Sequence, residues 1–263
     1  MMSYSNTNIK SSSFSVIISI ITPCYNSKFT IQETIQSVIS QTYPHWEMLI
    51  VDDCSTDGSD VIIQQYCKQD ARIKYFKTEK PSGSPTLPRN IGIQNAQGRF
   101  IAFLDSDDLW LPSKLEEQIK LFENNKTAIV FSNYEKMDAQ GNRNNRIIVA
   151  PCNTSYTELL KENVIGCLTA IYDTHKVGKL YFTPVGHEDF AMWLSILKRG
   201  YIAQNTNTVL ALYRLNAHSV SSNKIKAFQW TWNIYRKHEH LSLYKSCYYF
   251  LHYAIRATLK YFK

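Results

Sequence analysis

The sequence predicts an α/β protein with a mostly parallel central sheet flanked by helices and a helical extension at its C-terminus. In the first half, short apolar runs rich in β-branched residues alternate with stretches of helical periodicity. These runs are continuous rather than alternately polar and apolar, which is typical of parallel strands covered on both faces. The chain has 263 residues, 44% of them hydrophobic, enough for one large domain or a domain with an appendage.

The elements follow from this pattern in chain order. In the first half we expect strands at 16–21, 46–51, 72–76 and 100–104, separated by helices at 30–41, 59–69 and 89–96. The second half is less regular, and we expect a strand at 128–134, helices at 157–163 and 187–200, and strands near 201–204 and 208–213. Gly200 is the expected C-cap of the helix at 187–200.

The formal net charge of +7 belongs to the end of the chain. Residues 224–263 contain eight Lys or Arg and one acid, Glu239, whereas residues 1–223 contain 21 of each sign. Residues 1–223 are neutral overall, so the basic C-terminal segment is the only part of the sequence whose charge would favour nucleic acid. The charge pattern therefore gives little support to nucleic-acid binding.

The compartment indicated is the cytoplasm. The six cysteines are scattered without a CxxC pair, which favours a reduced protein over a disulfide framework or a zinc site. The N-terminus is polar, so residues 1–14 are expected to form a disordered tail. No run approaches the ~18 apolar residues of a spanning helix, and the longest candidate, 247–255, is too short.

In the stretch "RFIAFLDSDDLW" (99–110), an apolar strand is followed at once by three aspartates, Asp105, Asp107 and Asp108. If this segment is extended, Asp105 and Asp107 point the same way, as two oxygen ligands for Mg²⁺ or Mn²⁺. The alternative is a turn that caps a helix beginning near Pro112, a role for which Asp108 suffices. Three acids exceed what capping requires, so the pattern favours a metal.

Other polar groups follow the remaining strands. Thr22 ends the first strand, and Asp52 and Asp53 follow the second, so they should converge with the acidic motif on one crevice. Asp52 or Asp53 would accept hydrogen bonds from a nucleotide base or ribose. Glu188 and Asp189 begin a helix, where an acid ordinarily does no more than interact favourably with the helix dipole. They would have a functional role only if this end of the helix faces the same crevice.

Four segments together carry a family resemblance: "SIITPCYN", "SVISQTYPHWEMLIVDDCSTDGS", "PRNIGIQNAQGRFIAFLDSDDLW" and "HEDFAMWLSILKRG". In this order and spacing they resemble the family-2 glycosyltransferases of the GT-A fold, whose sheet is Rossmann-like. The resemblance covers residues 15–222, which we expect to form the GT-A domain, with 223–263 as a basic, aromatic helical extension.

The resemblance implies roles for residues at matching positions. Six of them would bind the nucleotide: Thr22 and Asp53 flanking the base, Tyr25 and Asp52 beside them, Arg89 in the loop before the acidic motif, and Asp105 towards the ribose. Asp107 would hold the Mn²⁺ or Mg²⁺ that bridges the diphosphate, and Asp189, preceded by Glu188, matches the general base.

The segment "YRLNAHSVSSN" (213–223), which contains Arg214, resembles the family segment that closes over the diphosphate. It departs from the family pattern, because the usual histidine falls on Asn216 and the nearest histidine is His218. His187 is a second histidine without an assigned role.

The function implied is inverting, metal-dependent transfer of a single sugar from a nucleotide-diphosphate sugar, most simply a UDP-sugar. The acceptor would be a hydroxyl of a glycan or lipid-linked acceptor in the biosynthesis of a bacterial surface polysaccharide. One alternative is a sugar-phosphate nucleotidyltransferase, although no glycine for a phosphate loop occurs before Gly58. A processive polysaccharide synthase is disfavoured because this sequence has no QxxRW motif. A non-catalytic carbohydrate- or membrane-binding protein is a further alternative, but it would not need Asp105, Asp107 and Asp189.

The extension combines Tyr and Trp with Lys and Arg, a composition used by helices at an anionic membrane surface. The alternative is a helical appendage that packs on the domain with its lysines in water. We therefore hypothesise peripheral binding to the inner face of the plasma membrane through residues 224–263.

Overall fold

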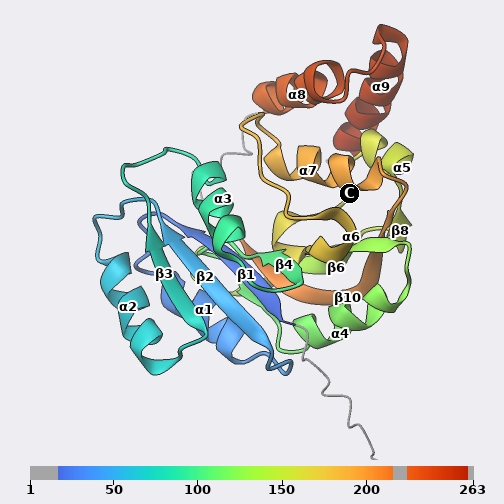
Figure 1. Cartoon of the computed structure of the whole chain (residues 1–263). Helices are drawn as coiled ribbons and strands as arrows, with labels where there is room; N and C mark the ends of the chain where they lie inside the picture. The colour runs from blue at the N-terminus through green and yellow to red at the C-terminus, as the bar shows by residue number, and fades with distance from the viewer. Residues whose placement is uncertain (1–16, 216–223, 260–263) are drawn as a thin grey trace, which may run out of the picture.

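The computed structural model describes residues 17–215 and 224–259 (Figure 1). The predicted tail 1–14 therefore lies outside the described residues. Ten strands in this part of the chain form one sheet, in the order β3-β2-β1-β4-β9-β6-β10-β5, with β7 beside β6 and β8 beside β10. The prediction of a mostly parallel sheet holds for β3-β2-β1-β4, whereas β9 runs antiparallel to both β4 and β6.

The N-terminal half matches the predicted alternation of strands and helices. Its elements are β1 (Ile18–Cys24), α1 (Ile31–Ile39), β2 (Trp46–Asp52), α2 (Ser59–Gln69), β3 (Ile73–Lys77), α3 (Thr86–Asn95) and β4 (Phe100–Phe103). The two central strands, β1 and β2, are buried along their whole length, which explains why their sequences are continuous apolar runs.

The second half contains more short elements than the sequence predicts. They are β5 (Leu109–Trp110), α4 (Lys114–Lys120), η1 (Leu121–Glu123), β6 (Thr127–Met137), β7 (Arg143–Ile148), β8 (Asn153–Thr154), α5 (Tyr156–Lys161), η2 (Cys167–Thr169), β9 (Ile171–Asp173), α6 (Thr174–Val177), α7 (Glu188–Leu197) and β10 (Ile202–Arg214). The prediction of two strands at 201–213 is wrong, because β10 continues through a register irregularity between Asn205 and Val209.

Two apolar clusters cover the two faces of the sheet. On one face, side chains of α1, α2 and α4 pack against alternate strand residues such as Ile20 and Ile50. On the other face, side chains of α3, α5 and α7 pack against the residues between them, such as Ile21 and Leu49. This alternation follows from the period of two along a strand.

The extension is helical, as predicted. It consists of α8 (Lys224–Asn233), a π-helical turn labelled η4 (Ile234–His238) and α9 (Leu243–Leu259), and it lies beyond α7 and α5 in Figure 1. It is tied to the domain through buried groups. The Tyr235 hydroxyl donates to the Leu160 carbonyl, and the buried Glu239 carboxylate accepts hydrogen bonds from Tyr156 (2.6 Å) and Lys198 (3.0 Å). No helix in the described ranges is long and apolar enough to cross a bilayer.

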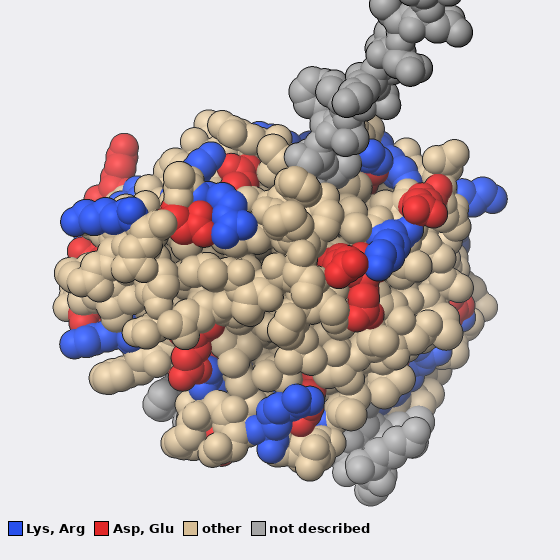
Figure 2. Space-filling view, turned by 90° about the horizontal axis from the view of Figure 1, so that it is seen from below, with Lys and Arg blue, Asp and Glu red and all other residues tan. Residues whose placement is uncertain are grey.

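On the face shown in Figure 2, acidic and basic side chains are interspersed rather than gathered by sign. This agrees with the neutral charge of residues 1–223.

Candidate active site

The carboxyl ends of β1, β2 and β4 bring the predicted polar residues to one edge of the sheet. The Asp53 N–H donates to the Cys24 carbonyl at the end of β1 (2.8 Å), and the Leu104 N–H donates to the Ile21 carbonyl (3.0 Å). The Asp52–Asp53 pair and the acidic segment after β4 therefore lie on either side of β1. This is the place where open α/β sheets bind ligands.

The acidic segment is a turn, so the extended backbone on which Asp105 and Asp107 would point the same way is not present. The Asp108 N–H donates to the Asp105 carbonyl (3.1 Å), and residues 106–107 are turn residues. The turn is fastened to α1 by hydrogen bonds from Thr30 to the Ser106 carbonyl (2.9 Å) and from Thr34 to the Asp108 carbonyl (3.0 Å). The period-two argument for Asp105 and Asp107 therefore does not apply, although both carboxylates remain partly exposed.

Asp108 does not cap the helix near Pro112. Its side chain is buried and accepts the backbone N–H of Arg214 (2.8 Å), while Ser113 precedes α4. Burial, together with the charges of Asp107 and Asp105, raises the pKa of Asp108 well above its usual value, and Arg214 opposes this shift. Asp108 thus links the acidic turn to β10.

Arg214, predicted to lie near the diphosphate, is engaged by the protein itself. It is buried, and its guanidinium donates to the carbonyl oxygens of Asp107 (2.7 Å) and Ala139 (3.1 Å) and to the Glu33 carboxylate (2.6 Å). With its N–H groups engaged in this way, Arg214 holds the acidic turn from behind. The rest of the predicted closing segment, including Asn216 and His218, lies outside the described residues.

Arg89 connects the acidic turn to the start of α7. It belongs to helix α3 and not to a loop, and it is buried. Its guanidinium donates to Asp105 (2.7 Å) and lies 3.7 Å from the Glu188 carboxylate. Burial opposes the charge of Arg89, but Asp105, with lesser contributions from Cys167 and Asp189, raises its pKa above the usual value. Its Nε is buried without a hydrogen-bond partner among the described residues.

Glu188 and Asp189 have different surroundings although they are adjacent. Glu188 accepts a hydrogen bond from Thr86 and pairs with Arg89, so it joins α7 to α3. Asp189 accepts the Phe190 N–H (2.8 Å) and a long contact from Asn163 (3.5 Å). Burial raises the pKa of Asp189, while Phe190, His187 and Arg89 oppose the shift. The start of α7 therefore does face the acidic turn, through Arg89.

The carboxylates of Asp52 and Asp53 accept hydrogen bonds from other groups of the protein. Asp52 is 0% exposed, and its carboxylate accepts hydrogen bonds from Ser55 and from the Tyr75 hydroxyl (3.0 Å). Both oxygens of this carboxylate therefore have protein partners, and its contact with a nucleotide stays a prediction. Asp53 is nearly buried and accepts hydrogen bonds from Ser82 (N–H at 2.9 Å) and other groups of the 78–83 loop.

The two remaining predicted nucleotide residues differ in access. Tyr25 is 59% exposed just beyond β1, so its ring is free to contact a ligand. Thr22 is fully buried within β1, and its hydroxyl has no hydrogen-bond partner among the described residues. Sequence reasoning missed Thr86, Asn163 and the loop around Ser82. The Ser- and Pro-rich composition of 81–86 is a signal for Thr86 and the loop around Ser82, whereas the sequence offers none for Asn163.

The residues present fit a divalent cation held partly by substrate. No group of three or more potential side-chain ligands occurs within residues 17–215 and 224–259. Asp107 and Asp105 offer hard carboxylate oxygens at this edge of the sheet, where both side chains are partly exposed. Mg²⁺ and Mn²⁺ are commonly bound by one or two such carboxylates, with phosphate oxygens and water completing the shell.

The fold, with an acidic turn after its fourth strand and a second carboxylate pair facing it, agrees with the GT-A glycosyltransferase fold of solved family members. Residues 19–176 match the family model "Glycosyl transferase family 2", and the chain belongs to that family. It is therefore an enzyme of the glycosyltransferase class, as the sequence predicts.

Two curated relatives cover most of the chain. It is 43% identical over 245 residues to the provisionally assigned teichuronic acid biosynthesis glycosyltransferase TuaG of Bacillus subtilis (strain 168), covering 93% of this chain and 97% of TuaG. It is 40% identical over 222 residues to the Escherichia coli enzyme WfgD, named UDP-Glc:alpha-D-GlcNAc-diphosphoundecaprenol beta-1,3-glucosyltransferase, covering 83% and 85% of the two chains.

Solved structures share the fold. S. aureus TarS 1–349 in complex with UDP-GlcNAc has a TM-score of 0.70 at 20% identity, covering 90% of this chain and 71% of that one. The mannosyltransferase PcManGT from Pyrobaculum calidifontis, in complex with GDP-Man and Mn²⁺, has a TM-score of 0.69 at 19% identity, covering 88% and 66%.

Proposed function

We propose that this glycosyltransferase moves a single sugar from a UDP-sugar to a hydroxyl of a lipid-linked acceptor, with inversion and with a divalent metal, in the biosynthesis of a bacterial surface polysaccharide. The observation that carries the proposal is Arg89, which lies 2.7 Å from Asp105 and 3.7 Å from Glu188. It joins the predicted donor side of the crevice to the helix that carries Asp189.

The donor-binding part of the site would consist of Tyr25, Asp105 and Asp107. The buried Thr22 and Asp53 would support it from within the sheet edge. Asp107 would hold Mn²⁺ or Mg²⁺, which neutralises charge that develops on the leaving diphosphate. Arg89, with a buried Nε that has no described partner, is placed to support negative charge beside Asp105.

The acceptor side would centre on Asp189. Its carboxylate takes the proton from the acceptor hydroxyl, whose oxygen forms a bond to the anomeric carbon. The bond from that carbon to the diphosphate breaks, and the nucleoside diphosphate leaves with the electron pair. A raised pKa suits this role, because a stronger base accepts a proton more readily. A single displacement inverts the configuration without a covalent glycosyl-enzyme.

The choice of donor and acceptor is supported by the relatives. WfgD is named for transfer from UDP-Glc to a GlcNAc-diphosphoundecaprenol, and the matched TarS structure holds UDP-GlcNAc. The test is a nucleotide-sugar panel with Mn²⁺ or Mg²⁺, scored by released nucleoside diphosphate for the wild type and Asp107→Ala. Metal-dependent release that is lost in Asp107→Ala supports the proposal. Release of pyrophosphate instead would indicate a nucleotidyltransferase, and equal release without metal would exclude the metal-dependent mechanism.

The extension would hold the enzyme at an anionic membrane surface, where a lipid-linked acceptor resides. Tyr244, Tyr248, Leu251 and Ile255 are exposed along one face of α9, at spacings of four and three residues. The eight cations of residues 224–263 complement anionic lipid.

Flotation of the full chain with vesicles containing phosphatidylglycerol tests this placement. The double variant Tyr248→Ser/Leu251→Ser should lose most binding, whereas Val149→Ser, an exposed apolar site on the domain, should bind like the wild type. Equal flotation of all three proteins would exclude α9 as the contact.

A further inference from the structure

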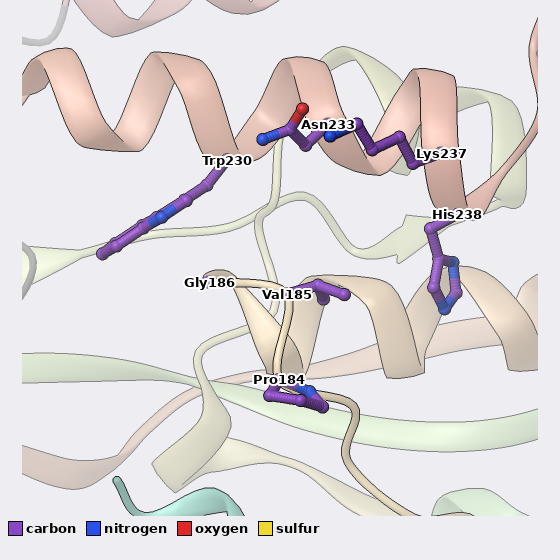
Figure 3. Close-up of a pocket in the computed structure, with 7 residues that line it drawn as sticks. All are labelled: Pro184, Val185, Gly186, Trp230, Asn233, Lys237 and His238. Atoms are coloured by element: carbon purple, nitrogen blue, oxygen red, sulfur yellow. The ribbon is translucent and has the colours of Figure 1, made fainter. Parts of the chain in front are cut away.

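A cavity of about 400 Å³ lies between the extension and the loop that leads into α7 (Figure 3). One wall consists of Pro184, Val185 and Gly186, and the other of Trp230, Asn233, Lys237 and His238. In Figure 3, Trp230 lies at one end and His238 at the other, with Asn233 and Lys237 between them. None of the residue roles considered above accounts for this arrangement.

The Trp230 ring is fixed by its neighbours. Gly186 has a φ of +97°, and a Cβ there would lie 2.2 Å from a ring atom, so the ring rests directly on the Gly186 backbone. The His187 ring meets it edge-on at 5.4 Å between centroids. Trp230 is nevertheless only partly buried. A fixed and accessible aromatic surface suits the apolar C–H face of a sugar ring.

The polar groups of the cavity are available to a ligand. Neither the Asn233 amide nor the Lys237 ammonium makes a side-chain hydrogen bond or ion pair to residues within the described ranges, and Lys237 is exposed. His238, by contrast, is held by Glu239 (3.2 Å). An amide can hydrogen-bond sugar hydroxyls, and an ammonium without an acidic partner suits a phosphate.

The cavity is next to the proposed reaction centre. Its wall at 184–186 continues through His187 into Glu188 and Asp189, the first residues of α7. A sugar stacked on Trp230 would therefore lie beside the residues that lead to the general base. The cavity is also on the side of the extension rather than among Asp105, Asp107 and Tyr25.

We propose that this cavity is the acceptor subsite, and that it binds a sugar carrying a diphosphate. Trp230 stacks on the sugar ring, Asn233 contacts its hydroxyls and Lys237 pairs with the diphosphate. The inference rests on the proposed function, because it assigns the acceptor of that reaction to this place.

Calorimetric titration of the full chain tests the subsite apart from catalysis. The probes are an alkyl GlcNAc-diphosphate, the matching monophosphate and the uncharged alkyl glycoside, all with the same short chain. We expect the wild type to bind the diphosphate most tightly. Trp230→Ala should weaken all three probes about tenfold, and Lys237→Ala should weaken the diphosphate about tenfold while leaving the uncharged glycoside unchanged.

Two control variants separate contact from packing. Trp232→Ala removes the other tryptophan of α8, which packs on Phe250 of α9 at 5.3 Å, and Lys245→Ala removes an exposed cation from α9. Both should bind the probes like the wild type. Equal weakening in Trp230→Ala and Trp232→Ala, or the absence of binding to all three probes, would overturn the proposal.

The donor reaction is measured in parallel without acceptor. The control variants Trp232→Ala and Lys245→Ala should release nucleoside diphosphate from the donor at the wild-type rate. If the wild type releases none from any donor, the proposed function fails, whereas lost probe binding with normal donor hydrolysis in the controls bears on the subsite alone.

Discussion

Arg214→Met tests whether Arg214 holds the acidic turn or binds the diphosphate. The buried guanidinium donates to the carbonyl oxygens of Asp107 at 2.7 Å and Ala139 at 3.1 Å, and to the Glu33 carboxylate at 2.6 Å. Methionine replaces the alkyl part of the side chain but supplies none of these N–H groups.

The cost follows from the partners left behind. A fully buried carbonyl that loses its donor costs about 1–3 kcal/mol, and the two carbonyl oxygens here are partly buried. The Glu33 side chain is 50% exposed, so water replaces its partner and the ion pair contributes only ~0–1 kcal/mol. Because partial hydration relieves the carbonyl oxygens, we expect the free energy of unfolding to fall by about 2–4 kcal/mol.

Urea unfolding followed by tryptophan fluorescence measures this change, with Glu33→Gln as the control that should lose less than ~1 kcal/mol. Donor affinity should fall as well, since the turn that carries Asp107 is no longer fastened. If Arg214→Met unfolds like the wild type but no longer binds donor, the guanidinium contacts the diphosphate and our reasoning is refuted.

Three further predictions concern single side chains. Asp189→Asn should lower the transfer rate ~10²–10⁴-fold; because burial raises the pKa of Asp189, the acidic limb of the wild-type pH–rate profile should lie above 3.8, and a limb at or below that value contradicts the assignment. Gly186→Ala would press a Cβ onto Trp230 at a φ of +97°, so thermal unfolding should show a loss of about 1–3 kcal/mol, and an unchanged Tm would contradict this packing. Burial lowers the pKa of Lys114 well below 10.5, so the unfolded chain binds more protons between the two pKa values and wild-type stability should rise with pH there. Urea unfolding at pH 7 and pH 9 should show this rise in the wild type and a smaller one in Lys114→Met.

The part of the fold that local sequence determines was predictable. β1, β2 and β4 are buried apolar runs, and polar residues follow each of them, so their common edge could be located before the structure. The short β9 was not predictable, because three residues carry no periodicity and its place depends on pairing with β4 and β6. The prediction of two strands in place of β10 is wrong because the polar residues 205–208 resemble a turn in sequence. In the structure they form an irregularity within one strand.

The sequence predicts where the polar residues gather but not the contacts that they make. The carboxylates of Asp105 and Asp107 could be identified because charge after a buried strand requires a reason. The position of Arg214 could not, since it depends on packing between residues more than a hundred positions apart. The same holds for Asp53, whose partners in the 78–83 loop come from a segment whose sequence shows only that it is a loop.

The pair Glu188–Asp189 shows how structure separates residues that sequence cannot. Both acids begin α7, and a motif alone gives no physical reason to prefer one as the base. Glu188 has the Arg89 guanidinium 3.7 Å away and accepts a hydrogen bond from the Thr86 hydroxyl, so its carboxylate is engaged in joining α7 to α3. Asp189 has no cation within ion-pair distance among the described residues, and burial raises its pKa. Since a general base needs affinity for a proton, these surroundings favour Asp189 as the base and Glu188 as the residue that positions α7 against Arg89.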